Sequence, residues 1–243
     1  MISGETGRRG HCPAFKRTDS MNIGRFLRKS AFGACGILLL TGSVWLISFA
    51  RSLRSPVEKS VQVPAGDSKI QGKANAPVQI VEYSDFECVA CGALQPDLKK
   101  VLETYPDKVS LVFHHFVIRS HVRSPLAHEA AECACEQGKF WGYYDLLYQY
   151  QDLWSQAADY TEELLNFARD LDLDLPKFVA CLGSPTVIDK IKQDTVSGEQ
   201  LGIKSTPTLF INGRMFVGKK QFEEEGMEFI RKELAKSDDN AAK

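Results

Sequence analysis

The sequence has no overall excess of basic charge, and its basic residues are concentrated at one end. The formal net charge is -1 over 243 residues. Residues 1–30 carry seven Lys and Arg against two Asp and Glu, whereas the remaining residues carry 23 against 29. A nucleic-acid-binding protein places a basic surface on its folded part. The composition therefore excludes that class and indicates that the basic end is a targeting segment.

Histidines are few, and their spacing does not suit a metal site. Of the five His, His114 and His115 are adjacent, and adjacent side chains on a strand point to opposite faces. His121 and His128 lack the i, i+4 spacing that places two ligands on one face of a helix. We therefore expect no metal and no cofactor.

An uncharged apolar run occupies residues 31–50, directly after the basic end. As a helix it would span roughly 30 Å, the thickness of a bilayer core. Residues 1–30 are then a basic head that stays cytoplasmic while the rest of the chain is exported. Ser48 and Ala50 provide the small residues of a cleavage site. We expect a transmembrane anchor or a signal peptide, hence a folded part that is membrane-anchored outside the cytoplasm, or secreted after cleavage. The true start is Met1 or Met21.

The hydrophobic pattern divides the rest of the chain into five stretches. Hydrophobic residues make up 44% of the chain, which excludes disorder over most of its length. Strands are expected on both sides of a helix, then helices without strands, then a hairpin at Asn212-Gly213 and a last helix. We expect a linker at 51–75, strand–helix–strand at 76–120, an inserted helical domain at 121–200, hairpin and helix at 201–235, and a polar tail at 236–243. This order predicts an α/β protein of thioredoxin fold with an inserted all-helical domain.

The motif Cys88-Val89-Ala90-Cys91 follows a predicted strand and opens a predicted helix. The first N–H groups of a helix lack partners and its dipole is positive there, so a thiolate at Cys88 would be stabilised. We assign Cys88 as the nucleophile and Cys91, one turn into the helix, as the resolving thiol. The alternatives are half of a zinc site and a purely structural disulfide. A zinc site needs four ligands, and Cys133-Ala134-Cys135 has the wrong spacing for the second half.

Two further features fit redox chemistry. Glu82 lies in an apolar strand, on the same face as Ile80 by alternation, so its carboxyl is expected to be buried, with a raised pKa and a capacity to shuttle protons. A strand-edge glutamate facing water is the alternative. Ser205-Thr206-Pro207 precedes the last pair of strands, where proline is tolerated.

Three blocks of sequence occur in order between residues 70 and 235. They are APVQIVEYSDFECVAC at 76–91, QGKFW at 137–141 followed by DLL at 145–147, and GIKSTPTLFING at 202–213. In this order they resemble the DsbA family of thiol–disulfide oxidoreductases, and most of all its membrane-anchored or secreted bacterial branch that includes BdbD-like proteins.

The resemblance implies specific roles for several residues. It implies that the Thr206–Pro207 peptide bond is cis and packs against Cys88, and that Glu82 is the buried acid beside Cys91. It also implies a second disulfide between two helices of the insertion, at Cys133 and Cys181, which leaves Cys135 as the remaining thiol. Pairing of Cys135 with Cys181, or three buried thiols, are the alternatives.

The resemblance implies reduced or unfolded exported proteins as substrates. The first hypothesis is an oxidase that donates its disulfide and is regenerated by a quinone-linked membrane partner, DsbB-like or vitamin-K-epoxide-reductase-like. The dipeptide Val89-Ala90 departs from the family, whose oxidising members commonly carry Pro followed by His, Tyr or Phe. A reductase or isomerase is therefore the second hypothesis, and a membrane-tethered, non-catalytic binding module is the third.

Overall fold

The computed structural model describes residues 69–241. The expected basic head, the transmembrane or signal segment at 31–50, and the linker up to residue 68 lie outside the described residues. Among the helices between residues 69 and 241, none has both the length and the apolar character needed to cross a bilayer.

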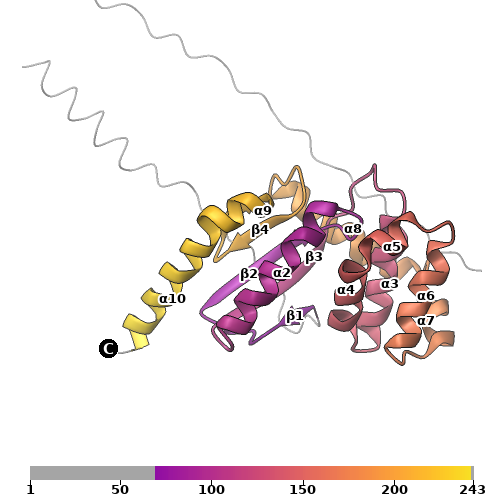
Figure 1. Cartoon of the computed structure of the whole chain (residues 1–243), viewed down its shortest axis with the longest axis horizontal. Coiled ribbons are helices and arrows are strands. Elements are labelled where there is room, and N and C mark those ends of the chain that lie inside the picture. Colours follow the sequence, from indigo (N-terminus) through magenta and orange to yellow (C-terminus); the bar gives the residue numbers. More distant parts are fainter. Residues whose placement is uncertain (1–68, 242–243) are drawn as a thin grey trace, which may run out of the picture. The chain divides into compact units, whose positions relative to one another are not determined.

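Within residues 69–241, five strands form one sheet in the order β1-β3-β2-β4-β5 (Figure 1). Strands β2 and β3 are parallel, because helix α2 (Val89–Thr104) connects the end of one to the start of the other. The pairs β1–β3, β2–β4 and β4–β5 are antiparallel. Asn212 and Gly213 form the last turn, with φ values of 46° and 87° that suit these residue types. The strands are β1 (Ile70–Gln71), β2 (Val78–Ser84), β3 (Val109–His115), β4 (Thr208–Ile211) and β5 (Arg214–Val217).

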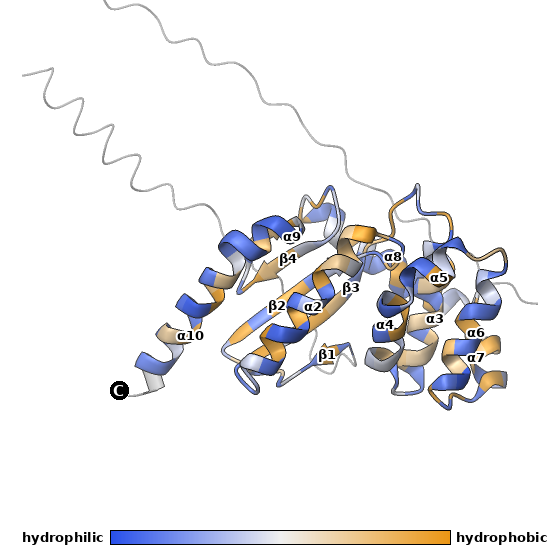
Figure 2. Cartoon of the chain, viewed as in Figure 1, coloured by the Kyte–Doolittle hydropathy of each residue, from blue (hydrophilic) through white to orange (hydrophobic). Residues whose placement is uncertain are grey.

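Helices cover both faces of the sheet, whose central strands are mostly apolar (Figure 2). One face packs against α2 and against the last helix, which runs as α9 (Gly218–Gln221), a π-helical turn η1 (Phe222–Gly226) and α10 (Met227–Ala241). The opposite face packs against α8 (Pro185–Gln200). Gly198 of α8 lies so close to the rings of Phe116 and Tyr83 that a Cβ there would come within 2.7 Å of the Phe116 ring. The glycine thus lets the helix approach the strands.

The remaining helices form a block between β3 and β4. They are α3 (Ser124–Glu136), α4 (Phe140–Gln149), α5 (Gln151–Gln156), α6 (Tyr160–Asp170) and α7 (Leu175–Cys181). Asp159, Asp174 and Ser184 cap α6, α7 and α8 by accepting a hydrogen bond from the backbone N–H three residues later. Cys133 of α3 and Cys181 of α7 form a disulfide with a Cα–Cα distance of 5.7 Å.

The structure differs from the expected boundaries in three places. The stretch 51–75, expected to be a linker, contains β1, which pairs with β3. A strand of two residues gives no periodic signal, so the sequence could not reveal it. The helix α8 was expected within a separate inserted domain at 121–200, but its second half packs on the sheet, and residues 69–241 lie in one compact unit. The tail expected at 236–243 is helical to residue 241, where Lys108 forms an ion pair with Asp238 of 2.9 Å.

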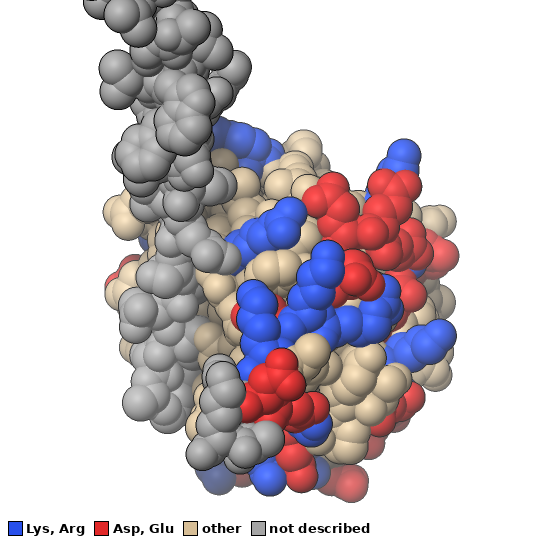
Figure 3. Space-filling model, turned by 90° about the vertical axis from the view of Figure 1, so that its left-hand side faces the viewer, with Lys and Arg blue, Asp and Glu red and all other residues tan. Residues whose placement is uncertain are grey.

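The face that carries α10 has charges of both signs side by side (Figure 3). Short-range ion pairs of α10 join Arg231 and Lys232 to Glu228, and Lys236 to Glu233. The helix thus keeps its polar side in solvent and buries Ile230 and Leu234.

Candidate active site

Cys88 lies where strand β2 gives way to helix α2, and it is the N-cap residue of that helix. Asp85 shapes the connecting turn. Its carboxylate accepts hydrogen bonds from the backbone N–H groups of Glu87 (2.8 Å) and Ile118 (2.7 Å) and from the Ser124 hydroxyl (2.8 Å). These bonds satisfy a fully buried carboxylate. The turn that presents Cys88 is thereby fixed to the start of α3.

The two cysteines of the motif have opposite environments. Cys88 is half-buried, whereas Cys91 is buried within the core. A hydrogen bond from the Cys91 thiol, with further ones from the Thr206 side chain and the backbone N–H groups of Cys91 and Ala90, lowers the pKa of Cys88 to about 6 against the opposing effect of burial. Burial and the neighbouring Cys88 raise the pKa of Cys91 well above its usual value. One sulfur is thus prepared to attack or to leave as a thiolate, and the other holds its proton.

The proline turn lies against Cys88. The Thr206–Pro207 peptide bond is cis, and the Cys88 thiol donates to the carbonyl oxygen of Thr206 at 3.6 Å. Thr208 stabilises the turn through its hydroxyl, which donates to the Ser205 carbonyl at 2.7 Å. The structure therefore brings together Cys88 and the Thr206–Pro207 turn, as the sequence analysis expected.

Glu82 is fully buried, on the same face of the sheet as Ile80. Its carboxyl accepts hydrogen bonds from the Tyr144 hydroxyl (2.8 Å) and the Gln95 side-chain amide (3.1 Å). Burial raises the pKa of Glu82, and the bonds from Tyr144, Ser84 and Gln95 oppose that rise. The sequence analysis missed these three partners. Alternation along the strand, which places Ser84 beside Glu82, could have identified that one.

A second link ties the helical block to the motif. The Gln151 side-chain amide donates to the carbonyl oxygens of Phe86 (2.7 Å) and Cys88 (3.0 Å). A Cβ at position 92 would lie 2.7 Å from the Gln151 side-chain oxygen, so Gly92 leaves room for this contact. Helix α5 thus holds the backbone on both sides of Glu87.

The profile of the thioredoxin family matches residues 65–230. The chain belongs to this family. It is similar to BdbD from Bacillus subtilis in its oxidised form, with 24% identity over 73% of this chain and 98% of that one, and a TM-score of 0.64. It is also similar to DsbA2 from Pseudomonas aeruginosa, with 28% identity over 68% of this chain and 92% of that one, and a TM-score of 0.52. Within the thioredoxin family the protein is DsbA-like.

The protein also resembles part of a transporter. It is 36% identical over 168 residues to the Na(+)/H(+) antiporter NhaA 3 of Salinispora tropica, which covers 69% of this chain. The chain spans about a quarter of the length of the curated relatives it matches. Ion transport is therefore not carried over to this DsbA-like protein.

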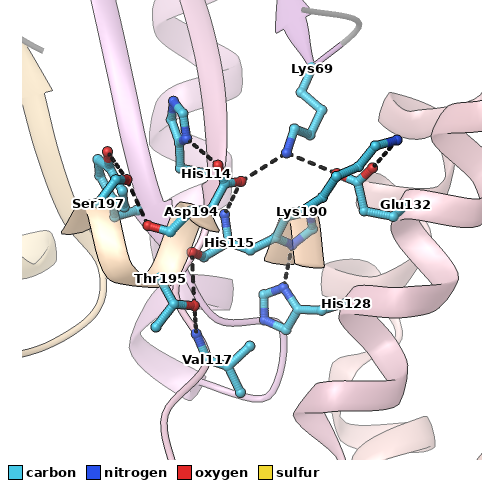
Figure 4. Close-up of polar contacts among 11 residues, drawn as sticks. Lys69, His114, His115, Val117, His128, Glu132, Lys190, Asp194, Thr195 and Ser197 are labelled. Atoms are coloured by element: carbon cyan, nitrogen blue, oxygen red, sulfur yellow. Dashed lines mark hydrogen bonds and ion pairs between the residues drawn. The ribbon is translucent and has the colours of Figure 1, made fainter. Parts of the chain in front are cut away.

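A cluster of buried charged and polar side chains surrounds Lys69 and the end of β3, and the sequence analysis missed it (Figure 4). Lys69 forms ion pairs with Glu132 (2.8 Å) and Asp194 (2.9 Å). His115 faces Glu132 of α3 at 2.8 Å, and His114 faces Asp194 of α8 at 2.8 Å. The cluster joins β3, α3 and α8 to Lys69, the residue directly before β1. Between residues 69 and 241, no group of three or more His, Cys, Asp or Glu side chains is arranged to hold a metal ion.

Proposed function

We propose that this thiol–disulfide oxidoreductase donates the Cys88–Cys91 disulfide to reduced exported proteins outside the cytoplasm. The observation that carries the proposal is the difference between the two cysteines. The half-buried Cys88 has a pKa lowered to about 6 by hydrogen bonds that its sulfur accepts from the Cys91 thiol, the Thr206 side chain and the backbone N–H groups at the start of α2, while Cys91 is buried and holds its proton.

The reaction proceeds in two exchanges. A substrate thiolate attacks the Cys88 sulfur, the Cys88–Cys91 bond breaks, and Cys91 leaves as a thiolate that takes up a proton. A second substrate thiolate then attacks the first substrate sulfur, and Cys88 leaves as a thiolate. The substrate gains a disulfide, the enzyme gains its two electrons, and of the two protons released by the substrate one ends on Cys91 and the other in solvent.

The lowered pKa of Cys88 favours donation over acceptance. A thiolate with a low pKa is a good leaving group, and its stabilisation favours the reduced form of the enzyme. The disulfide is correspondingly easy to give away. The exposed dipeptide Val89-Ala90 brings neither an imidazole nor an aromatic ring to this thiolate, which is the observation in favour of the alternative, a reductase or isomerase.

The surface near Cys88 suits an unfolded chain. Val89, Val122 and Leu153 are exposed by 74%, 75% and 53%. Val89 follows Cys88 directly, Val122 precedes Arg123, whose N–H donates to Glu87 at 2.9 Å, and Leu153 is on the helix of Gln151. Exposed apolar side chains near a reactive group bind apolar segments that a folded substrate would hide. Reduced proteins that have not yet folded are therefore the proposed substrates.

The proposed location and partner follow from the sequence. The basic head and the apolar run at residues 31–50 support export with a membrane anchor, or secretion if the run is cleaved. Outside the cytoplasm the reduced dithiol needs an electron acceptor, and a quinone-linked membrane oxidoreductase of the DsbB or vitamin-K-epoxide-reductase type supplies one.

The test combines a redox titration with an oxidation assay. The oxidised protein is mixed with reduced, unfolded ribonuclease A, and substrate disulfides are counted after acid quenching. We expect transfer by the wild type and by Cys135→Ser, and none by Cys88→Ser. Titration with glutathione should give the Cys88–Cys91 pair a reduction potential above about -180 mV. A reduction potential near the roughly -270 mV of thioredoxin supports the reductase instead. Equal oxidation by Cys88→Ser would leave the binding module as the surviving hypothesis.

A further inference from the structure

His128 holds the turn that presents Cys88 from the side of the helical block. Its Nε2 atom accepts a hydrogen bond from the backbone N–H of Phe86 at 3.5 Å, and its ring lies against the Phe86 ring with centroids 4.7 Å apart. Phe86 is the second residue of this turn, which the Cys88 N–H closes by donating to the Asp85 carbonyl oxygen at 3.1 Å. The Phe86 carbonyl oxygen accepts from the Gln151 amide at 2.7 Å. Both the N–H and the carbonyl group of Phe86 are thus held by side chains of the helical block.

A second histidine determines which nitrogen of His128 carries the proton. His128 and Glu132 are one turn apart on α3, so both face the end of β3, where the His115 ring contacts each of them (Figure 4). Because Nε2 of His128 accepts from the Phe86 N–H, the proton of its neutral ring lies on Nδ1, which donates to Nδ1 of His115 at 2.5 Å. The proton of His115 then lies on Nε2, which donates to the Glu132 carboxylate at 2.8 Å. This one direction of donation satisfies all four ring nitrogens.

Both rings stay neutral at pH 7 because their surroundings disfavour a positive charge. Each ring is fully buried. Burial, with the positive charge of Lys69, lowers the pKa of His115, and burial, with the neighbouring His115, lowers the pKa of His128 well below its usual value. An added proton would also meet another hydrogen, either between the two facing Nδ1 atoms or against the Phe86 N–H. The direction of the three hydrogen bonds is therefore fixed at neutral pH.

We propose that His128 is a positioning residue whose neutral Nδ1–H form holds the Phe86 amide, so that the turn keeps Cys88 at the start of α2. The proposal rests on the proposed function. The first backbone N–H groups of α2 stabilise a thiolate at Cys88, and their place relative to the turn depends on how the turn is held. Without its acceptor, the buried Phe86 N–H would be unsatisfied, and the turn would shift toward another partner. His115 and Glu132 act further back, by fixing the proton on Nδ1 of His128.

Two substitutions of His128 separate positioning from packing. The side-chain amide of a glutamine reaches the place of Nε2, whereas that of an asparagine reaches only the place of Nδ1. His128→Gln therefore keeps an acceptor for the Phe86 N–H, and His128→Asn keeps only a contact with His115. Both variants lose the ring, so both should melt at a lower temperature than the wild type.

The decisive readout is the pKa of Cys88, measured by thiolate absorbance in the reduced protein. It should rise by about 1 unit in His128→Asn and stay within about 0.3 unit of the wild type in His128→Gln. At pH 7 the equilibrium constant for oxidation of glutathione by the Cys88–Cys91 disulfide should fall about fivefold in His128→Asn, because the reduced form loses thiolate stabilisation. His114→Asn is the control for loss of a buried histidine. His114 is hydrogen-bonded to Asp194 of α8 at 2.8 Å, and its loss should leave the Cys88 pKa in place.

NMR spectra that correlate the ring nitrogens of histidine with their carbon-bound hydrogens test the wild type directly. We expect a protonated Nδ1 in His128 and a protonated Nε2 in His115 at pH 7. These spectra require no substitution, so they decide even where a variant does not fold. A protonated Nε2 in His128, or equal Cys88 pKa values in His128→Gln and His128→Asn, overturns the positioning role while disulfide transfer by the wild type still stands. Absence of transfer from the wild type to reduced ribonuclease A overturns the proposed function itself.

Discussion

The Cys88 thiol donates to the Thr206 carbonyl oxygen at 3.6 Å, across 118 positions of sequence. This contact places the cis Thr206–Pro207 turn next to the sulfur that is proposed to react. The predictions below concern the charge of that sulfur, the residues that tune it, and the framework that holds it.

The reactivity of Cys88 should follow a titration centred near pH 6. The pKa of this thiol is lowered from 9.0 to about 6, first by the hydrogen bond from Cys91. The thiolate and the stability it gives to the reduced protein should therefore be complete above pH 9 and lost as the pH falls through 6. Absorbance of the thiolate near 240 nm and the rate of iodoacetamide alkylation measure the titration.

Cys91→Ala should raise the Cys88 midpoint, because it removes the largest stabilising contact of the thiolate. Cys135→Ala, at a thiol outside the motif, is the matched control and should leave the midpoint in place. A wild-type midpoint near 9 would contradict the assignment of Cys88 as nucleophile.

Ala90→His should make the dithiol more oxidising. The backbone N–H of Ala90 already hydrogen-bonds to the Cys88 sulfur, and an imidazolium at the same residue adds positive charge beside the thiolate. We expect the Cys88 pKa to fall by about 1 unit and the reduction potential to rise by about 30 mV. Val179→His, on an exposed position of α7, controls for added histidine. A lower pKa with an unchanged potential would break the proposed link between them.

Loss of the second disulfide should destabilise the fold without altering the active thiol. Cys133 and Cys181 are separated by 48 residues, and closing a loop of this size contributes about 3–4 kcal/mol. The Cys133→Ala, Cys181→Ala double variant should therefore melt about 10 °C lower than the wild type in the absence of reductant. Scanning calorimetry measures this, and the Cys88 titration should be unchanged. If the melting temperature falls no further than in the Cys135→Ala variant, the Cys133–Cys181 disulfide adds nothing to stability.

Glu132→Gln should destabilise the protein most at neutral pH. Ion pairs and hydrogen bonds with His115 and Lys69 lower the pKa of Glu132 to about 2 against the opposing effect of burial. Since this pKa is below the usual 4.5, the stabilisation is present above pH 4.5 and lost as the pH falls through 2. Removing the Glu132 charge leaves a buried partner charge uncompensated, which should lower the free energy of unfolding by about 3 kcal/mol at neutral pH.

Urea unfolding at a series of pH values from 7 downwards measures the free energy of unfolding of Glu132→Gln and of the wild type. The difference between these two free energies should narrow below pH 4.5. Asp238→Asn, which breaks the exposed pair with Lys108, should cost less than about 1 kcal/mol at any pH. Equal losses for the two variants would mean that the buried cluster is no more important than a surface pair.

The sequence predicted the parts of the fold that depend on local pattern. Alternation in β2 placed Glu82 on the face of Ile80, and Asn212-Gly213 marked the hairpin. The partners of Glu82 could not be predicted in this way. Tyr144 is one of several ring-bearing residues of an apolar helix, and its hydroxyl meets Glu82 because α4 docks on α2.

The same limit applies to the buried cluster. Lys69 occurs in a polar stretch without periodicity, and its partner Asp194 lies 125 positions later. Charged residues are expected at the surface, so the polar composition around Lys69 favoured a linker at residues 51–75. Only the three-dimensional structure, in which Lys69 contacts Glu132 of α3 and Asp194 of α8, shows that the lysine is buried and paired.

Helix α8 belongs to two parts of the molecule at once. Val187 and Ile191 pack in the helical block, whereas Gly198 lies against Tyr83 and Phe116 of the sheet. The same helix therefore holds the helical block against the sheet on the face opposite α2. For the oxidation of reduced proteins proposed above, this attachment means that an unfolded chain, which can change its own shape, suits the site better than a folded substrate.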